Sequence, residues 1–210
     1  MKVSLADVQA SDKKLFIGAD EVGYGCLAGP LVVCAVRAPK DWSLAGLNDS
    51  KKLSQKQREG MRDKLNPLIK KGDILFHIAE RSNLEIDTHG VAAMLKSAYV
   101  ECFTSFVGAK ESLIIIDGIL KFDNLGVDDY NIVSLIKADT LVPSVMAASI
   151  LAKTYRDDKM RAFHEQYPQY NWQSNVGYGA PVHLKAMREH GLSPLHRRSY
   201  KVKTMLDLYE

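Results

Sequence analysis

The chain is short of cysteine and of long apolar runs, and both shortages restrict what it can be. Its cysteines, Cys26, Cys34 and Cys102, are odd in number and form no Cys-x-x-Cys pair. Such cysteines are typical of small buried apolar side chains in a reducing compartment rather than of a disulfide framework. No apolar stretch approaches the ~20 residues that a bilayer-spanning helix needs, and residues 1–14 lack the apolar core of a signal peptide. We therefore expect a cytoplasmic protein without a membrane partner.

The sequence also has little excess charge of either sign, no internal repeat, no low-complexity tract and no linker. It has 28 lysines and arginines and 25 aspartates and glutamates, which gives a net charge of +3 and a pI near 8.6. This balance permits a polyanionic partner without requiring one. Because 46% of the 210 residues are hydrophobic, the chain can form one substantial core, and we expect a single domain over residues 1–210.

Strand and helix patterns alternate along the chain. Ser54 with Gln57 predicts a capped helix start and Gly72 predicts its end, with a disturbance at Pro67 left open. Pro143 suits the first turn of a later helix. The predicted strands cover 15–19, 31–36, 74–79, 113–116 and 132–136, and the predicted helices lie between 54 and 72 and over 86–107, 145–163 and 182–190. This alternation indicates an α/β fold with a mixed sheet.

Acidic side chains stand where the predicted strands end. Asp20 and Glu21 follow the first strand, Asp117 directly follows a later one, and Asp139 comes shortly after the next. Strand ends at one edge of an α/β sheet converge, and carboxylates brought together repel unless cations lie between them. Oxygen ligands favour Mg²⁺ or Mn²⁺, and four of them can hold the two ions of a phosphodiester-cleaving site. Each acid taken alone can equally be an ordinary turn former.

Several ordered motifs run through nearly the whole chain. They are Asp20–Pro30, Leu47–Ser54, Ile116–Gly118, Lys137–Asp139, Ala147–Lys153 with Arg156 and Asp157, Gly177–Gly179, His183 and His196–Tyr200. Together they resemble the sequence blocks of the type 2 ribonucleases H, the RNase HII family. Several blocks in the right order form a far more specific signal than any one of them.

The resemblance implies a ribonuclease H-like fold, with a central mixed sheet flanked by helices and a helical, substrate-binding part over roughly 160–210. It implies Asp20, Glu21, Asp117 and Asp139 as the catalytic ligands of two Mg²⁺ or Mn²⁺ ions. The implied activity is metal-dependent endonucleolytic cleavage of the RNA strand of RNA/DNA hybrids and of the 5′ side of ribonucleotides embedded in duplex DNA. This cleavage leaves a 3′-hydroxyl and a 5′-phosphate and belongs to ribonucleotide excision repair.

The implied partners are RNA/DNA hybrids and ribonucleotide-containing duplex DNA, and we expect a monomer. Residues 205–209 are open to two interpretations. They form either a tail that binds a replication partner or a helix docked on the core.

The resemblance also implies substrate contacts, because an enzyme of this kind must find the ribose 2′-hydroxyl. Backbone groups of Gly23, Tyr24 and Gly25 would reach the ribonucleotide on the 5′ side of the cut, since glycines let the backbone approach closely. Tyr178 would stack against the sugar of the next nucleotide, or would be an ordinary loop aromatic. Phosphate contacts are assigned to Lys51, Lys153 and Arg197, with Ser149 as a hydrogen-bonding neighbour of Lys153 at i, i+4. A solvated surface charge is the alternative for each basic residue.

Histidines and neighbouring aromatics are expected to support the site rather than to carry the chemistry. His164, His183 and His190 are expected beside the site or on helix surfaces, and not as the catalytic base. Tyr170 and Trp172 are expected to pack under the glycine-rich loop.

Some positions depart from the family pattern. Tyr24 replaces Arg, Val176 replaces Lys, Ala138 replaces Gly, Ile119–Leu120 replaces a more polar pair and Met146 replaces a small residue. Two basic side chains are therefore missing from the substrate face, which leaves the affinity and the balance between the two substrates open. A preference for continuous hybrids, as in the type 3 enzymes, is one alternative. A non-catalytic binder is another, against which the full carboxylate set argues because without metal it would repel nucleic acid.

Overall fold

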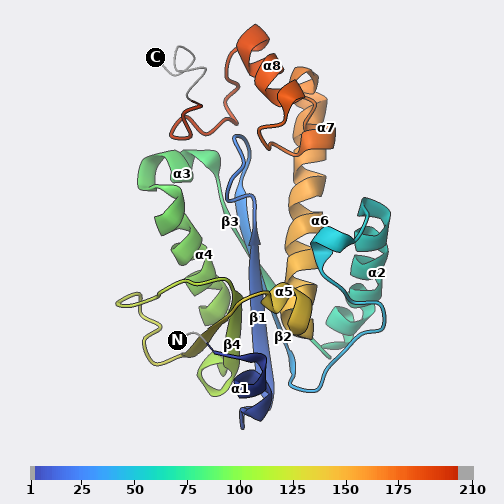
Figure 1. Ribbon diagram of the computed structural model, residues 1–210, viewed down its shortest axis with the longest axis vertical. Coiled ribbons are helices and arrows are strands. Elements are labelled where there is room, and N and C mark those ends of the chain that lie inside the picture. The colour runs from blue at the N-terminus through green and yellow to red at the C-terminus, as the bar shows by residue number, and fades with distance from the viewer. Residues whose placement is uncertain (1–2, 203–210) are drawn as a thin grey trace.

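The computed structural model describes residues 3–202 and has a mixed, five-stranded sheet at its centre (Figure 1). The strand order is β3-β2-β1-β4-β5, with β1 antiparallel to β2 and parallel to β4. The pair β2–β3 is antiparallel and the pair β4–β5 is parallel. The strands are β1 (Leu15–Val22), β2 (Leu31–Pro39), β3 (Leu75–Arg81), β4 (Leu113–Asp117) and β5 (Asn131–Leu135). The predicted α/β class and mixed sheet are confirmed.

Helices cover both faces of this sheet (Figure 1). Along β2, Leu31, Val33 and Ala35 belong to one buried cluster with α4, whereas Cys34 and Val36 belong to another with α2 and α6. A strand that is buried on both faces has a nearly continuous apolar sequence, as β2 does. The helices are α1 (Leu5–Ala10), α2 (Gln55–Lys71), α3 (Asn83–His89), α4 (Val91–Thr104), α5 (Ala138–Leu141), α6 (Pro143–Gln166), α7 (Trp172–Asn175) and α8 (Pro181–His190), with short 3₁₀ helices η1 (Ser50–Lys52), η2 (Ala109–Glu111) and η3 (Pro168–Tyr170).

The helix predicted over 86–107 is wrong as a single element. The chain forms α3 and α4 with a break at Gly90, whose φ of 82° and ψ of 143° are not helical. A glycine adopts this conformation without steric cost, so the apolar stripe alone did not reveal the break.

The ends of two other elements also differ from the prediction. The first strand extends to Val22, which pairs with Val32, so that Asp20 and Glu21 lie inside β1 rather than after it. The helix α2 has the predicted capping box at Ser54 and runs through Pro67 without interruption. Pro67 is exposed, so the carbonyl that loses its N–H partner can face water.

The close approach of α6 to β1 depends on Gly18. A Cβ atom at Gly18 would lie 2.2 Å from the backbone nitrogen of Val145, on the first turns of α6. Side chains alternate along a strand, so Asp20 faces the same helix two residues later. Ser149, one turn beyond Val145, lies close enough to Asp20 to lower its pKa.

The C-terminal helices pack around an aromatic pair, as the sequence suggested. Tyr170 and Trp172 are buried, and their rings stack with centroids 5.1 Å apart. They share a cluster with Val176, at the start of the glycine-rich loop. Within residues 3–202, no helix combines the length and the apolar character needed to cross a bilayer.

The contact between β1 and α6 predicts an asymmetry between two glycine substitutions. Gly18→Ala should destabilise the protein by at least about 1–3 kcal/mol, because backbone atoms of α6 must move. Gly60→Ala, inside α2 with nothing within 4 Å of the added carbon, should instead stabilise it by about 0.5–1 kcal/mol. Urea unfolding of both variants checks this, and a Gly18→Ala protein as stable as the wild type would contradict the packing argument.

Candidate active site

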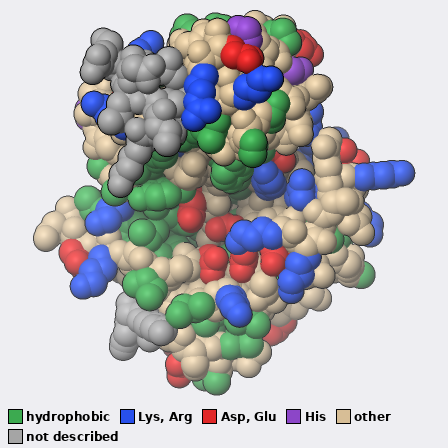
Figure 2. All heavy atoms as spheres, turned by 45° about the horizontal axis from the view of Figure 1, so that its top comes forward, with side chains coloured by type: hydrophobic (Ala, Val, Ile, Leu, Met, Phe, Trp, Pro, Cys, Tyr) green, Lys and Arg blue, Asp and Glu red, His purple; other side chains and the backbone are tan. Residues whose placement is uncertain are grey.

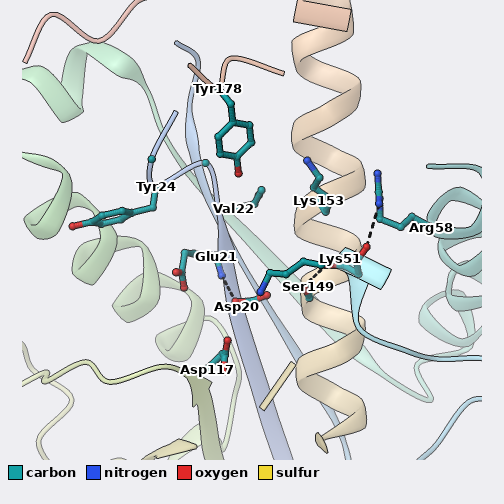
Figure 3. A pocket seen from close by; sticks show the side chains of 13 residues that line it. Asp20, Glu21, Val22, Tyr24, Lys51, Arg58, Asp117, Ser149, Lys153 and Tyr178 are labelled. Carbon is teal, nitrogen blue, oxygen red and sulfur yellow. Dashed lines mark hydrogen bonds between the residues drawn. The ribbon is translucent and has the colours of Figure 1, made fainter. Parts of the chain in front are cut away.

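A pocket opens at the C-terminal end of β1, where acidic and basic side chains meet (Figure 3). Its lining comes from β1, the turn after it, η1, α2, β4, α6 and the glycine-rich loop. The lining residues are Asp20, Glu21, Val22, Gly23, Tyr24, Gly25, Ser50, Lys51, Arg58, Asp117, Ser149, Lys153 and Tyr178. Figure 2 shows acidic side chains gathered in a hollow of this face, with basic side chains beside them.

Asp20 is the most buried of the acids in the pocket. Its pKa is raised to about 7, first by burial and then by the charges of Glu21 and Asp117, while Ser149 acts in the opposite direction. Its Oδ1 accepts the backbone N–H of Glu21 at 2.9 Å. The site therefore holds Asp20 in place while leaving its negative charge poorly compensated.

Glu21 points to the opposite face of β1 from Asp20, toward α4. There its Oε2 accepts a 2.5 Å hydrogen bond from the hydroxyl of Tyr99, which is completely buried. Burial raises the pKa of Glu21, while the Tyr99 bond lowers it and the charge of Asp117 raises it. Tyr99 thus fixes this carboxylate. Sequence analysis missed Tyr99, although it lies on the apolar stripe of α4 one turn after Leu95.

Asp117 ends β4, the parallel neighbour of β1, and reaches the same pocket. Its Oδ1 accepts the backbone N–H of Ala138 at 2.9 Å. Burial raises its pKa, and so does the charge of Asp139. The expected convergence of strand-end acids thus holds for Asp20, Glu21 and Asp117.

Asp139 lies beside the pocket, in the short helix α5, and is joined to it by Lys51. The Nζ of Lys51 donates to Oδ2 of Asp139 at 2.7 Å. This bond raises the pKa of Lys51, as do the charges of Asp139, Asp20 and Asp117, against a smaller opposing effect of burial. The Lys51 side chain is 72% exposed, so its ammonium is a movable cation next to the acids.

The acids suit a divalent cation by their chemistry. As the side chains stand, no three acidic, histidine or cysteine residues among 3–202 are grouped closely enough to hold an ion. Every candidate ligand nevertheless offers carboxylate oxygens, which hard cations such as Mg²⁺ and Mn²⁺ prefer. The pKa values of Asp20, Glu21 and Asp117 are raised first by burial and then by neighbouring acidic charges, and bound cations would offset both effects.

The turn after β1 leaves part of its backbone open to a ligand. Gly23 has a φ of 89°, and a Cβ there would lie 2.3 Å from Nε of Arg156, so only glycine fits. Gly25 has open space around it. In the part of the chain that the structure describes, the backbone N–H groups of Tyr24 and Gly25 donate no hydrogen bond.

Two buried arginines hold this turn from behind. Arg156 donates to the carbonyls of Pro30 and Ala28 at 2.8 and 3.0 Å. Arg197 donates to the carbonyls of Gly29 and Tyr24, both at 3.0 Å.

The structure does not bring Arg197 into the pocket. With 1% of its surface exposed, its guanidinium is not available for the phosphate contact expected from the sequence. Sequence analysis assigned no role to Arg156, because a buried arginine cannot be told from an exposed one by its neighbours along the chain.

The wall of the pocket opposite Tyr24 is basic. Lys153 faces the pocket and donates to Asp157, one turn later on α6, at 2.8 Å. Arg58, which sequence analysis missed, lines the same wall and donates to the carbonyl of Ser50 at 3.1 Å. The hydroxyl of Ser149 lies 2.7 Å from that of Ser50, which ties α6 to η1.

Tyr178 borders the pocket from the glycine-rich loop, and a chain of neutral groups holds its backbone. The indole N–H of Trp172 donates to Nε2 of His183 at 3.0 Å, so Nδ1 of His183 carries the proton and donates to the Tyr178 carbonyl at 2.8 Å. Nδ1 of His196 accepts the N–H of Ser193 at 2.9 Å, which leaves its Nε2 to face His183 at 3.1 Å. Burial lowers the pKa of His183 and lowers that of His196 to about 3.

The histidines named from the sequence thus occupy different settings. His183 is fully buried beneath the loop, and not on a helix surface. His164 lies on α6 and His190 is exposed at the end of α8. None of the three lines the pocket.

Comparison with known proteins gives a consistent match in sequence. The family model for Ribonuclease HII matches residues 17–203. The Ribonuclease HII of Cytophaga hutchinsonii is 37% identical over 200 residues, which are 95% of this chain and 96% of that protein. The Ribonuclease HII of Clostridium beijerinckii is 39% identical over 193 residues, 90% of this chain and 68% of that protein.

Solved structures match in fold. Ribonuclease H2 from Pyrococcus horikoshii OT3 superposes with a TM-score of 0.75 at 23% identity, covering 93% of this chain and 97% of that one. The RNase HII of the PCNA complex from Archaeoglobus fulgidus gives 0.72 at 24% identity, with 90% and 96% covered. Bst-RNase HIII in complex with Mn²⁺ gives 0.62 at 22% identity, with 87% and 65% covered. The predicted ribonuclease H-like fold is confirmed.

The uncompensated charge of Asp20 predicts how the metal-free protein responds to pH. Its pKa of about 7 in the folded state lies above the ordinary 3.8, so the folded protein binds this proton more tightly than the unfolded chain does. The free energy of unfolding should therefore fall as pH rises from about 4 to about 7. Asp20→Asn removes the ionised form and should add on the order of 1–3 kcal/mol at pH 8.

Urea unfolding in EDTA at pH 5.5 and pH 8 measures this effect. Asp63→Asn, an exposed acid on α2, is the matched control and should shift stability by less than about 0.5 kcal/mol. Equal stabilities of Asp20→Asn and wild type at pH 8 would contradict the charge argument.

Proposed function

This chain belongs to the ribonuclease HII family and is a hydrolytic nuclease of the ribonuclease H type, and we propose that it uses two divalent ions to cut the RNA strand of RNA/DNA hybrids and the 5′ side of ribonucleotides in duplex DNA. The products would carry a 3′-hydroxyl and a 5′-phosphate. The observation that carries this proposal is the pocket in which Asp20, Glu21 and Asp117 face the basic Lys51 and Lys153.

The residues that would hold Mg²⁺ or Mn²⁺ are Asp20, Glu21, Asp117 and Asp139. Such ions, when bound, lower the pKa of an attacking water and offset the charge that develops on the phosphate and the leaving 3′-oxygen. The structural relative Bst-RNase HIII was solved with Mn²⁺. Lys51 would move from Asp139 toward the substrate, because its exposed side chain has the freedom to do so.

Phosphate binding would fall to the basic wall. Lys51, Lys153 and Arg58 line one side of the pocket, and cations at this place attract the negatively charged strand past acids that would otherwise repel it. Ser149 would help to orient Asp20, since it lies beside that carboxylate and lowers its pKa. Arg197 would act only by holding the turn, through the carbonyls of Gly29 and Tyr24.

Recognition of the ribose would fall to the turn of Gly23, Tyr24 and Gly25. The N–H groups of Tyr24 and Gly25, which donate to nothing within residues 3–202, can donate to a 2′-hydroxyl. Tyr178 would pack on the sugar of the next nucleotide, since its ring borders the same pocket and lies 5.8 Å from Nζ of Lys153.

The proposal extends to organisation and partners. We take residues 1–210 as one domain whose part from about 160 onward helps to bind substrate, acting as a monomer in ribonucleotide excision repair. A cytoplasmic location rests on the three cysteines, which are buried free thiols. The Archaeoglobus fulgidus relative was solved with PCNA, which supports a replication partner for this chain too. Residues 205–209, the tail named for that role, lie outside the described residues.

Cleavage assays test the function directly. Labelled duplexes that contain one ribonucleotide, a continuous RNA strand or DNA alone are incubated with the protein in Mg²⁺, Mn²⁺ or EDTA. We expect cleavage of both ribonucleotide substrates with either metal, and none of pure DNA or in EDTA. Cleavage in EDTA would overturn the metal proposal, and cleavage of the continuous hybrid alone would favour a type 3 preference.

The assignment of four carboxylates as metal ligands predicts a large loss of activity when either Asp117 or Asp139 is neutralised. Asp117→Asn or Asp139→Asn should reduce kcat by more than about 10²-fold at saturating Mg²⁺, because each removes charge that stabilises the transition state through the ions. Asp63→Asn should cleave like the wild type. Near-normal turnover by Asp139→Asn would remove that residue from the ligand set.

The place of Tyr178 predicts a graded response. Tyr178→Ala should lower kcat/KM by about five- to a hundredfold, the usual range for loss of one aromatic stacking contact. Tyr178→Phe should keep most of the activity, since the ring is preserved. Equal losses in the two variants, measured on the single-ribonucleotide duplex, would assign the role to the hydroxyl instead.

A further inference from the structure

The acids of the pocket separate two walls of different character. One wall carries Lys51, Arg58 and Lys153. On the other side, a second pocket shares Glu21, Tyr24 and Asp117 with the first. The other residues that line this second pocket come from α4 and from the chain after β4: Ala92, Leu95, Lys96, Gly118, Ile119 and Leu120. Together with Tyr24, we call these residues the apolar shelf. In Figure 3, Tyr24 points away from Lys51 and Lys153, toward α4.

The apolar shelf exposes large side chains that the core does not need. Ile119 is 65% exposed and Tyr24 is 43% exposed, whereas Leu95 in the same pocket is buried. Gly118, with a φ of 81°, turns the chain between Asp117 and Ile119. The apolar side chain of Ile119 is thus only two positions away from the carboxylate. Single exposed apolar residues are common, but here two of them border the carboxylates in one pocket.

Tyr24 and Ile119 meet in this pocket from distant parts of the chain. Their side chains come from segments almost a hundred positions apart, and the fold brings them to the same pocket. One cation, Lys96, lies among the residues that line this pocket. Because Glu21 and Asp117 line it as well, the charged side chains of this pocket carry no net positive charge, which suits it to an uncharged group rather than to a phosphate.

A nucleic acid strand offers charged and uncharged parts that match these two walls. Its phosphates are attracted to the basic wall and repelled by Glu21 and Asp117, which border the shelf. Its bases carry no charge and have apolar faces that stack on aromatic rings. A strand whose phosphate lies over the acids can thus place a base on the shelf only if its backbone follows the basic wall.

We propose that the apolar shelf binds a nucleobase of the substrate next to the scissile phosphate, through contacts with Tyr24 and Ile119. This inference rests on the proposed nuclease function and adds a second, uncharged subsite to it. The shelf then fixes the orientation of the strand across the acids, because only one arrangement satisfies both walls.

A cycle of base removal and side-chain replacement tests the shelf. An abasic nucleotide is placed in turn at each position around the single ribonucleotide of a duplex, and kcat/KM is measured for wild type, Ile119→Ser and Leu84→Ser. Leu84 is the matched control, an exposed apolar residue on α3 that is 68% exposed and lies outside both pockets. The kcat/KM of the wild type should fall about five- to a hundredfold when the base at one particular position is removed.

In Ile119→Ser, the loss at that same position should be measurably smaller than in the wild type, because one of the two contacts is already absent and only that of Tyr24 remains. Leu84→Ser should behave like the wild type. Equal losses in wild type and Ile119→Ser at every position would overturn the shelf while leaving the nuclease function intact. Failure of the wild type to cleave any ribonucleotide duplex would instead overturn the proposed function.

Salt dependence separates the two walls. In an Asp139→Asn background that binds without cutting, the slope of log affinity against log salt should be unchanged by Ile119→Ser. Lys153→Gln should reduce the slope by about 0.7–0.9, the value for one lost phosphate contact. A reduced slope in Ile119→Ser would show that the shelf acts on the phosphate backbone, which contradicts the proposal.

Discussion

The site depends on holding like charges together in a buried place. Asp20, Glu21 and Asp117 are brought together by two parallel strands, and burial together with the charge of a neighbouring acid raises the pKa of each. Hydrogen-bond donors offset part of this cost: the Glu21 N–H for Asp20, Tyr99 for Glu21 and the Ala138 N–H for Asp117. These donors orient the carboxylates without neutralising their charge. The excess that remains is what a divalent cation can bind, so the instability of the metal-free site and the metal binding that we propose for it would have the same origin.

The packing around the acids follows from the need to hold their carboxylates in fixed orientations. Gly18 lets α6 approach β1 closely enough for Ser149 to reach Asp20, and alternation along β1 sends Glu21 to α4 on the other face. The two acids that are neighbours in sequence are thus held by helices on opposite faces of the sheet. A movement of either helix would change the separation of the carboxylates, so the packing of both faces contributes to the geometry of the site.

The sequence predicted the acids better than it predicted their surroundings. Strand-end position and the ordered motifs were enough to name Asp20, Glu21 and Asp117, because the register of a parallel sheet brings such residues together. The position of Asp139 beside the pocket, bonded to Lys51, depends on a short helix that no periodicity reveals. The interpretation of Arg197 failed for a different reason. Its motif indicates that it matters, but only the fold shows that its guanidinium faces backbone carbonyls rather than the substrate.

The two tyrosines that border the pocket are positioned in the same way. Arg197 holds the carbonyl of Tyr24, and His183 holds the carbonyl of Tyr178, while both rings remain partly exposed. Both donors are buried and belong to the C-terminal part of the chain. Because Arg197 and His183 donate to backbone carbonyls, the turn and the loop can keep their positions whatever side chains stand at positions 24 and 178. Positioning and recognition are therefore separable here. This explains how the side chain at position 24 can differ without disturbing the turn, and how this face of the site can change its preference for charged or apolar contacts while the carboxylates stay fixed.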